Sequence, residues 1–112
     1  MGPFEPIDGL SSGMILEKAL LQVKPGQAEA FEQAMHQAKP LVSCQPGFQS
    51  IEVRRNAEEQ HQYLLLIGWD KIESHRDGFR KSSEYQQWRS LLHDFYDPMP
   101  TVNYIGASIF DD

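Results

Sequence analysis

Two side chains with chemical potential lie close together in the middle of the chain. Trp69 ends an apolar run that begins at Tyr63, and His75 follows six residues later. Indole supplies a flat apolar wall with one N–H donor, and imidazole titrates closest to neutral pH. Together they would line a small apolar pocket in which a phenol loses its proton. Each is also consistent with a plain core position, where an inward Trp or His packs and is hydrogen-bonded.

Further side chains extend this pocket hypothesis. Arg89 lies beside the apolar stripe of a predicted helix, where it would either hold an anionic oxygen at the pocket rim or form a surface ion pair. Tyr63 and Tyr104 lie on predicted strands, where they would line the cavity or fill it. The rest of the substrate pocket would be built from four apolar side chains: Leu65, Ile72, Phe79 and Trp88.

Other kinds of site are not indicated. The sequence has no Walker loop and no GxGxxG, HExxH or GxSxG motif. Its four histidines, at positions 36, 61, 75 and 93, include no i, i+4 pair, so we expect no metal site. Cys44 is the single cysteine, which excludes an internal disulfide, and no cation or His lies near it in sequence to activate its thiol.

Size and charge narrow the class of protein. With 112 residues and 40% hydrophobic residues, the chain has the size of one globular domain. Its net charge of -6 argues against nucleic acid and against an anionic membrane surface as partners. No apolar run approaches the roughly 20 residues that span a bilayer, and no signal peptide is recognisable. We therefore expect a cytoplasmic protein.

The strands that must position Trp69 and His75 follow from the sequence pattern. Residues 1–13, rich in Gly, Pro and Ser, predict a flexible N-terminal arm, and residues 14–112 a single domain. Alternating or continuous apolar residues bounded by turn signals predict the strands: 15–23, 48–55, 61–69 and 101–110.

The helices are predicted from a different period. Apolar residues at helical spacing predict a helix over 28–42, which Pro40 would either kink or end in its regular part near Lys39. Asp70 with Glu73 has the spacing of a capping box that opens a short helix. A second such pair, Ser83 with Gln86, would open a longer one.

This β-α-β-β-α-α-β order predicts an α+β fold, the ferredoxin-like split βαβ arrangement with a four-stranded antiparallel sheet. The helices of such a fold cover one face of the sheet. The strand at 61–69 is apolar on both faces, so its second face must also be covered. A second copy of the same sheet would do this, which predicts a homodimer packed sheet to sheet as a dimeric α/β barrel.

Several motifs, spread over residues 15–106, resemble the antibiotic biosynthesis monooxygenase (ABM) family of dimeric α+β barrels. They are Pro46-Gly47-Phe48, Gly68-Trp69 through His75, Phe79-x-x-Ser82 and Tyr85-x-x-Trp88. A region around Pro100, Val102 and Tyr104 adds to the resemblance.

The resemblance implies a cofactor-independent monooxygenase that oxidises a small aromatic or quinol substrate with O₂. The deprotonated substrate itself reacts with O₂ in such enzymes, so neither metal nor flavin is required. Trp69 matches the family's pocket tryptophan, His75 a polar aromatic position in some members, and Arg89 approximately an oxygen-binding arginine. The resemblance thus makes His75 the proton acceptor. Leu65 stands where some oxygenases have Asn.

Two alternatives stay open. Haem-degrading members of the family combine a first-strand Asn, a Trp and a haem-ligating His on the last helix. Residues 14–23 contain no Asn, and the ligand position falls near Arg89, with His93 one turn further along. The other alternative is a dimeric protein that binds a small ligand in the same cavity without turnover.

Overall fold

The computed structural model describes residues 14–110, so the arm predicted at residues 1–13 lies outside the described part of the chain. Four strands and two longer helices follow one another: β1 (Ile15–Gln22), α2 (Ala28–Ser43), β2 (Phe48–Arg55), β3 (Gln62–Trp69), α3 (Ser83–Leu92) and β4 (Val102–Ile105). Short helical segments at Ser74–Gly78 and Phe79–Lys81 precede α3, and another at His93–Phe95 follows it.

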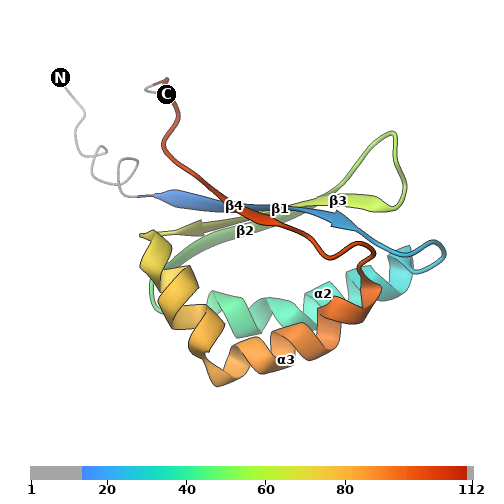
Figure 1. The fold of residues 1–112 in the computed structure, drawn as a ribbon, viewed down its shortest axis with the longest axis horizontal. Helices are drawn as coiled ribbons and strands as arrows, with labels where there is room; N and C mark the ends of the chain where they lie inside the picture. Colours follow the sequence, from blue (N-terminus) through green and yellow to red (C-terminus); the bar gives the residue numbers. More distant parts are fainter. Residues whose placement is uncertain (1–13, 111–112) are drawn as a thin grey trace.

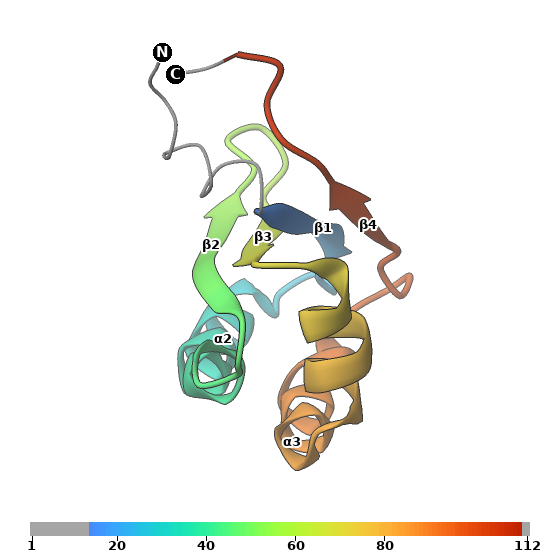
Figure 2. The ribbon, with the colours of Figure 1, turned by 90° about the vertical axis from the view of Figure 1, so that its left-hand side faces the viewer.

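The strands form one antiparallel sheet in the order β2-β3-β1-β4. Both helices lie on the same side of this sheet, α2 below β2 and α3 toward the β1–β4 side (Figures 1 and 2). The predicted α+β, ferredoxin-like architecture is confirmed. The two central strands pair over their full length, from Ile15 opposite Trp69 to Gln22 opposite Gln62.

Strand alternation explains which side chains meet the helices. Every second residue of β3 is buried on the helix side: Tyr63, Leu65, Ile67 and Trp69. The apolar face of α2 packs against them through residues at helical spacing: Phe31, Met35, Ala38 and Val42. The core therefore lies between the sheet and the two helices.

The helix α2 continues through Pro40 to Ser43, so Pro40 does not end its regular part. Proline lacks the N–H that would bond to the carbonyl of His36. Pro40 and His36 are both solvent-exposed, so water can satisfy that carbonyl and the last turn survives.

The segments around α3 and β4 also differ in detail. The N-cap of α3 is Ser82, one residue before the predicted Ser83, and its hydroxyl accepts the Tyr85 N–H at 3.2 Å. The carboxylate of Asp70 accepts the hydroxyl of Ser74 in place of a capping box with Glu73. The strand β4 ends at Ile105, far short of residue 110, because Ile105 lies opposite Leu16 and its partner strand β1 begins only one residue earlier, at Ile15.

The face of the sheet opposite the helices carries five aliphatic side chains: Leu16, Leu20, Leu64, Leu66 and Ile105. Two of them are strongly exposed, Leu20 at 44% and Ile105 at 42%. The helices are elsewhere, as Figure 1 shows, so this face lacks a cover within residues 14–110. None of the described helices has the length and apolar character needed to cross a membrane.

Candidate functional site

A cleft of about 520 Å³ lies between the sheet and α3. Its apolar walls come from β1, β3 and the helical side: Ala19, Leu21, Leu65, Phe79, Trp88 and Val102. The same cleft is lined by seven titratable side chains: Glu17, His75, Arg80, Tyr85, Arg89, His93 and Tyr96. It therefore combines room for a small aromatic molecule with groups that can move a proton or hold an anion.

Glu17 is the most unusual of these groups. It lies on β1 in the inward register of Ala19 and Leu21, and only 5% of it is exposed. Because Ile67 is its partner across the β1–β3 ladder, Trp69 is its diagonal neighbour on the same face. The Trp69 indole Nε1–H donates to Glu17 Oε1 at 2.9 Å. The buried face of the sheet thus contains a carboxyl group that accepts a hydrogen bond from a tryptophan.

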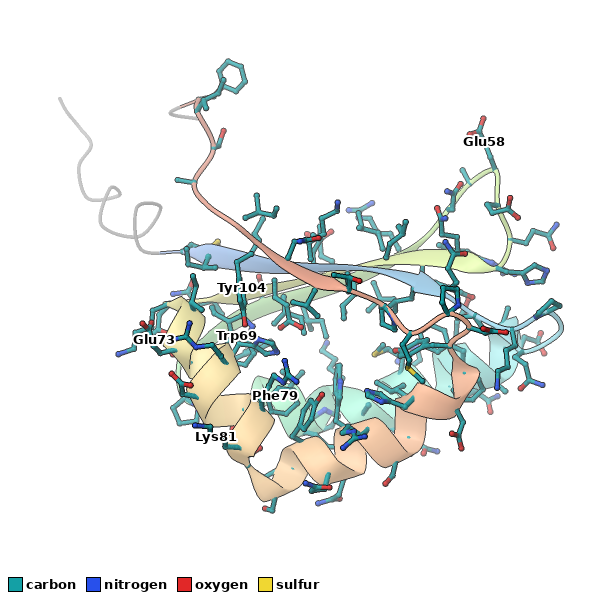
Figure 3. The ribbon with its side chains drawn as sticks, viewed as in Figure 1. Glu58, Trp69, Glu73, Phe79, Lys81 and Tyr104 are labelled. Atoms are coloured by element: carbon teal, nitrogen blue, oxygen red, sulfur yellow. The ribbon has the colours of Figure 1, made fainter. Side chains whose placement is uncertain are left out.

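His75 connects this carboxyl to β4. Its Nε2 lies 3.4 Å from Glu17 Oε2, and its Nδ1 lies 2.6 Å from the hydroxyl of Tyr104. The imidazole is 3% exposed and lies beside the Trp69 and Phe79 rings. Figure 3 shows Tyr104, Trp69 and Phe79 on the helix side of the sheet, beside the short helical segments. Both ring nitrogens of His75 therefore face protein groups.

Backbone geometry aims His75 inward. It belongs to a π-helical turn, Ser74–Gly78, a conformation that often marks functional sites. Gly47, with φ +86°, packs against the start of this turn, where a Cβ would collide with Asp70 and Ser74. Its carbonyl also accepts the Asp70 N–H at 2.8 Å. The Pro-Gly turn before β2 thus anchors the chain between Trp69 and His75.

Burial shifts the pKa values of both Glu17 and His75, in opposite directions. It raises the pKa of Glu17 from 4.5 to about 7, against the opposing effects of the Trp69 hydrogen bond and Arg80. It lowers the pKa of His75 from 6.5 to about 4, with a further contribution from Arg80. The imidazole is consequently neutral at physiological pH, while the carboxyl exchanges its proton there.

Basic side chains face the same cleft from the helical side. Arg80 comes from Phe79–Lys81 and Arg89 from α3, and neither forms an ion pair with any residue in the range 14–110. His93 lies one turn beyond Arg89, and burial, followed by the charge of Arg89, lowers its pKa. The two arginines give the cleft a positive rim around the buried Glu17–His75 pair.

The residues singled out from the sequence fall into several places. The cleft is lined by five of them: Leu65, His75, Phe79, Trp88 and Arg89. Trp69 is fully buried behind Glu17, and Tyr104 contacts the site through His75. Ile72 is half-buried and does not line the cleft. Tyr63 lies in a separate hollow of about 360 Å³ between α2 and β2, where its hydroxyl donates to Glu32 at 2.6 Å.

Two site residues, Glu17 and Arg80, were not among the sequence candidates. A signal for Glu17 was present, because it is the only charged residue in the inward phase of β1 that continues through Ala19 and Leu21. Arg80 had no such signal, since its position depends on the irregular turns between Ser74 and Lys81. Among residues 14–110, no group of three or more His, Cys, Asp or Glu side chains is placed to hold a metal ion.

Comparison with known proteins identifies the family. The sequence profile described as antibiotic biosynthesis monooxygenase (ABM) matches residues 14–91, most of the chain and all of the site except β4 and the residues after α3. The chain belongs to the ABM family. Its relative YczJ from Bacillus subtilis (strain 168), an uncharacterized protein, is 46% identical over 91 residues, which cover 81% of this chain and 96% of YczJ.

Solved ABM structures share the fold. A Bordetella bronchiseptica protein named for the antibiotic biosynthesis monooxygenases superimposes with a TM-score of 0.83 at 31% identity, over 87% of this chain and 99% of that one. A mutant of SnoaB from Streptomyces nogalater, a cofactor-independent oxygenase, gives a TM-score of 0.77 over 88% of this chain and 97% of its own. At 14% identity, the likeness to SnoaB concerns the fold alone.

Proposed function

We propose that this ABM protein is a cofactor-independent monooxygenase that oxidises a small phenol or hydroquinone with O₂ in the cleft between the sheet and α3. One observation carries the proposal: a buried carboxyl with a pKa of about 7 and a neutral imidazole line a cleft that has apolar and aromatic side chains in its walls and arginines at its rim. Family membership and the activity named for SnoaB support the same class of reaction.

The reaction needs no external reductant. Loss of the hydroxyl proton converts the phenol into an electron-rich phenolate, which donates electrons to O₂. One oxygen atom is added to the ring as the new quinone oxygen, and the other leaves as water. The phenolic hydrogen and the displaced ring hydrogen become the two hydrogens of that water. A phenol plus O₂ thus gives a quinone plus water, and the substrate supplies all four electrons.

The described side chains suit these steps. The Glu17–His75 pair accepts the substrate proton, and Trp69 orients the carboxyl through its indole N–H. Arg89 and Arg80 face the negative charge of the phenolate from the helical side. The ring of the substrate would pack among three apolar side chains: Leu65, Phe79 and Trp88.

Oxygen uptake tests the proposal. The purified protein is mixed with a panel of hydroquinones and phenols in the presence of a strong chelator, and O₂ consumption is followed with an electrode. We expect saturable uptake with at least one substrate, matched by quinone formation and unchanged by the chelator. Saturable binding of these compounds without O₂ uptake would identify a binding protein and refute the proposal.

A titration with hemin separates the haem-degrading alternative. The proposal predicts no saturable change in the Soret band. A saturable change accompanied by loss of the porphyrin spectrum in the presence of a reductant would favour haem degradation instead.

We also propose that the protein works as a homodimer packed sheet to sheet. The support is the row of aliphatic side chains on the face of the sheet opposite the helices. Leu64 on β3 lies opposite Leu20 on β1, and Ile105 on β4 lies opposite Leu16. Leu66 adds to this exposed hydrophobic surface from β3. Sedimentation equilibrium of the wild type should give twice the monomer mass, and Leu66→Arg should shift it toward the monomer. Gln33→Arg, on the exposed side of α2, is the matched control. A wild-type protein that stays monomeric would contradict this assembly.

A further inference from the structure

We infer that Glu17, rather than His75, is the group that takes the proton from the substrate, and that Trp69, His75 and Tyr104 act as positioning residues for its carboxylate. This assignment rests on the proposed function and concerns its first step, removal of the substrate hydroxyl proton. The reason is that the Glu17 carboxylate keeps acceptor lone pairs free toward the cleft, whereas His75 does not.

The hydrogen-bonding capacity of the two candidates differs. Nδ1 of His75 is hydrogen-bonded to the Tyr104 hydroxyl at 2.6 Å, and Nε2 lies 3.4 Å from Glu17 Oε2. Each carboxylate oxygen has two acceptor sites. Glu17 uses one of them for the Trp69 indole, and it lines the cleft with acceptor capacity left. A substrate hydroxyl can therefore bond to Glu17 without breaking the network, whereas bonding to His75 would require a partner to leave.

A neutral His75 carries one ring proton, and the Tyr104 hydroxyl can either donate to Nδ1 or accept from it. We infer the tautomer in which Tyr104 donates, because it leaves the ring proton on Nε2, the nitrogen that lies 3.4 Å from Glu17 Oε2. The indole N–H of Trp69 donates to Oε1. One hydrogen bond and one close contact, both fixed by packing, thus orient the carboxylate.

Charged and titratable groups surround Glu17 from every side of the cleft. Arg80 lies on the short segment before α3, His75 on the π-helical turn and Tyr104 on β4, while Arg89 and His93 line the cleft from α3 and its extension. Tyr85 and Tyr96 complete the titratable lining of the cleft. None of these groups is a carboxylic acid, so no second carboxylate competes for the substrate proton among the described lining residues.

The proton-transfer step is balanced within the site. The substrate O–H bond breaks and a Glu17 O–H bond forms, so the negative charge moves from the carboxylate to the phenolate, which faces Arg80 and Arg89. After the phenolate has reacted with O₂, Glu17 returns the proton to the oxygen atom that leaves as water. Glu17 ends the cycle as a carboxylate.

An anaerobic experiment tests this step without turnover. Hydroquinone is added under argon at pH 8, where Glu17 is mostly ionised, and the infrared difference spectrum is recorded. We expect the hydroxyl of the bound hydroquinone to donate a hydrogen bond to the ionised Glu17 carboxylate and to shift its carboxylate stretching bands, in the wild type and in the Glu32→Gln control but not in Glu17→Gln. Glu32 is a matched control because it also accepts from an aromatic donor, Tyr63, but lies outside the cleft. Saturable binding without this shift in the wild type would overturn the assignment to Glu17.

Steady-state kinetics provides the second arm. We expect kcat/KM of the wild type to rise with pH through about 7 and then to level. Glu17→Gln should lower kcat at least ~100-fold, in line with the usual contribution of a general base, and should abolish this pH step. Glu32→Gln should change neither. His75→Gln should keep the step at a displaced pH and lose less activity. A Glu17→Gln enzyme with wild-type kcat would overturn the inference.

The two arms keep the failures apart. If no quinol is oxidised by the wild type but the anaerobic shift of the carboxylate bands appears, the proposed function fails while Glu17 remains the group of the cleft that accepts the substrate hydroxyl. If quinols are oxidised but the pH step persists in Glu17→Gln and disappears in His75→Gln, the function stands and His75 is the base.

Discussion

Among residues 14–110, two carboxyl groups accept a hydrogen bond from a buried aromatic side chain. One lies in the cleft beside α3 and the other in the hollow beside α2. In the cleft, the indole of Trp69 donates to Glu17 at 2.9 Å. In the hollow, the hydroxyl of Tyr63 donates to Glu32 at 2.6 Å. The donor residues both lie on the buried face of β3, so one strand supports both pairs.

The surroundings of the two carboxyls differ. The Glu32 side chain lies on α2, is 47% exposed and has Arg55 at 3.8 Å. Glu17 lies on a central strand, its side chain is 6% exposed and its nearest titratable neighbour is a neutral imidazole. A similar hydrogen bond is thus a surface contact in the hollow and part of a buried polar network in the cleft. Burial without a close counterion makes the difference, since it keeps the Glu17 proton exchangeable near neutral pH.

The largest expected effect comes from removing the buried charge. Raising the Glu17 pKa from 4.5 to about 7 implies that ionised Glu17 costs the folded state about 3 kcal/mol above pH 7. Glu17→Gln should therefore increase the free energy of unfolding at pH 9 by about 3 kcal/mol, whereas Glu32→Gln should change it by less than about 1 kcal/mol. Urea denaturation at pH 9 measures both. Equal changes in the free energy of unfolding for Glu17→Gln and Glu32→Gln would contradict the claim that only the Glu17 charge is costly to bury.

Shortening the aromatic donors should give a smaller contrast. Trp69→Phe removes the bond to a buried carboxyl and leaves space in the core, so we expect a loss of about 2 kcal/mol of stability at pH 7. Tyr63→Phe should cost about 1 kcal/mol or less because water can replace the hydroxyl beside half-exposed Glu32. Thermal and urea unfolding of the two variants provide the comparison. A costlier Tyr63→Phe would contradict this ranking.

The pH dependence of stability should separate Glu17 from His75. Because folding raises the Glu17 pKa, its contribution is present below pH 4.5 and is lost as pH rises to about 7. Because folding lowers the His75 pKa, its contribution is present above pH 6.5 and is lost as pH falls to about 4. The two slopes oppose each other in the wild type.

Single variants should expose each slope. Relative to the wild type, the unfolding free energy of Glu17→Gln should rise with pH between 4.5 and 7, by up to about 1.4 kcal/mol per pH unit. The unfolding free energy of His75→Gln should fall with pH relative to the wild type between pH 4 and 6.5. This slope should have a similar magnitude and the opposite sign. Denaturant titrations at several pH values test this. Slopes of the same sign would show that the pair does not titrate as described.

The smallest effect concerns the arginines beside the two carboxyls. Arg80 lowers the Glu17 pKa, so Arg80→Gln should move the pH step of kcat/KM upward. Arg55→Gln should leave that step in place and cost less than about 1 kcal/mol of stability, because its pair with Glu32 is half-exposed. A pH step that moves in Arg55→Gln, or moves downward in Arg80→Gln, would contradict the placement of Arg80 near Glu17.

The sequence predicts the fold well because its signals are local. Alternation in residues 48–55 reproduces β2 at both ends, and the apolar run before Trp69 marks β3 within one residue. The end of α2 is different, since the effect of Pro40 depends on whether its side of the helix meets water. The length of β4 likewise depends on its pairing with β1, which local pattern does not reveal.

The site is less accessible from the sequence because it is assembled across strands. The shared face of His75 and Phe79 is readable from their spacing, and both are buried. The partner of the Trp69 indole is not readable, because it depends on the register that sets Glu17 opposite Ile67. The π-helical turn that aims His75 at Glu17 depends on the packing of Gly47. A charged residue in the inward phase of a central strand is the general signal to look for.

The central claim is that Glu17 is a buried carboxyl that exchanges its proton near neutral pH. The most direct measurement is a ¹³C NMR titration of the glutamate side-chain carboxyls in the ligand-free protein, with the Glu17 resonance assigned by its absence in Glu17→Gln. Because burial raises the pKa of Glu17, we expect a midpoint near pH 7 for this resonance. A midpoint at or below the ordinary value of 4.5 would contradict it.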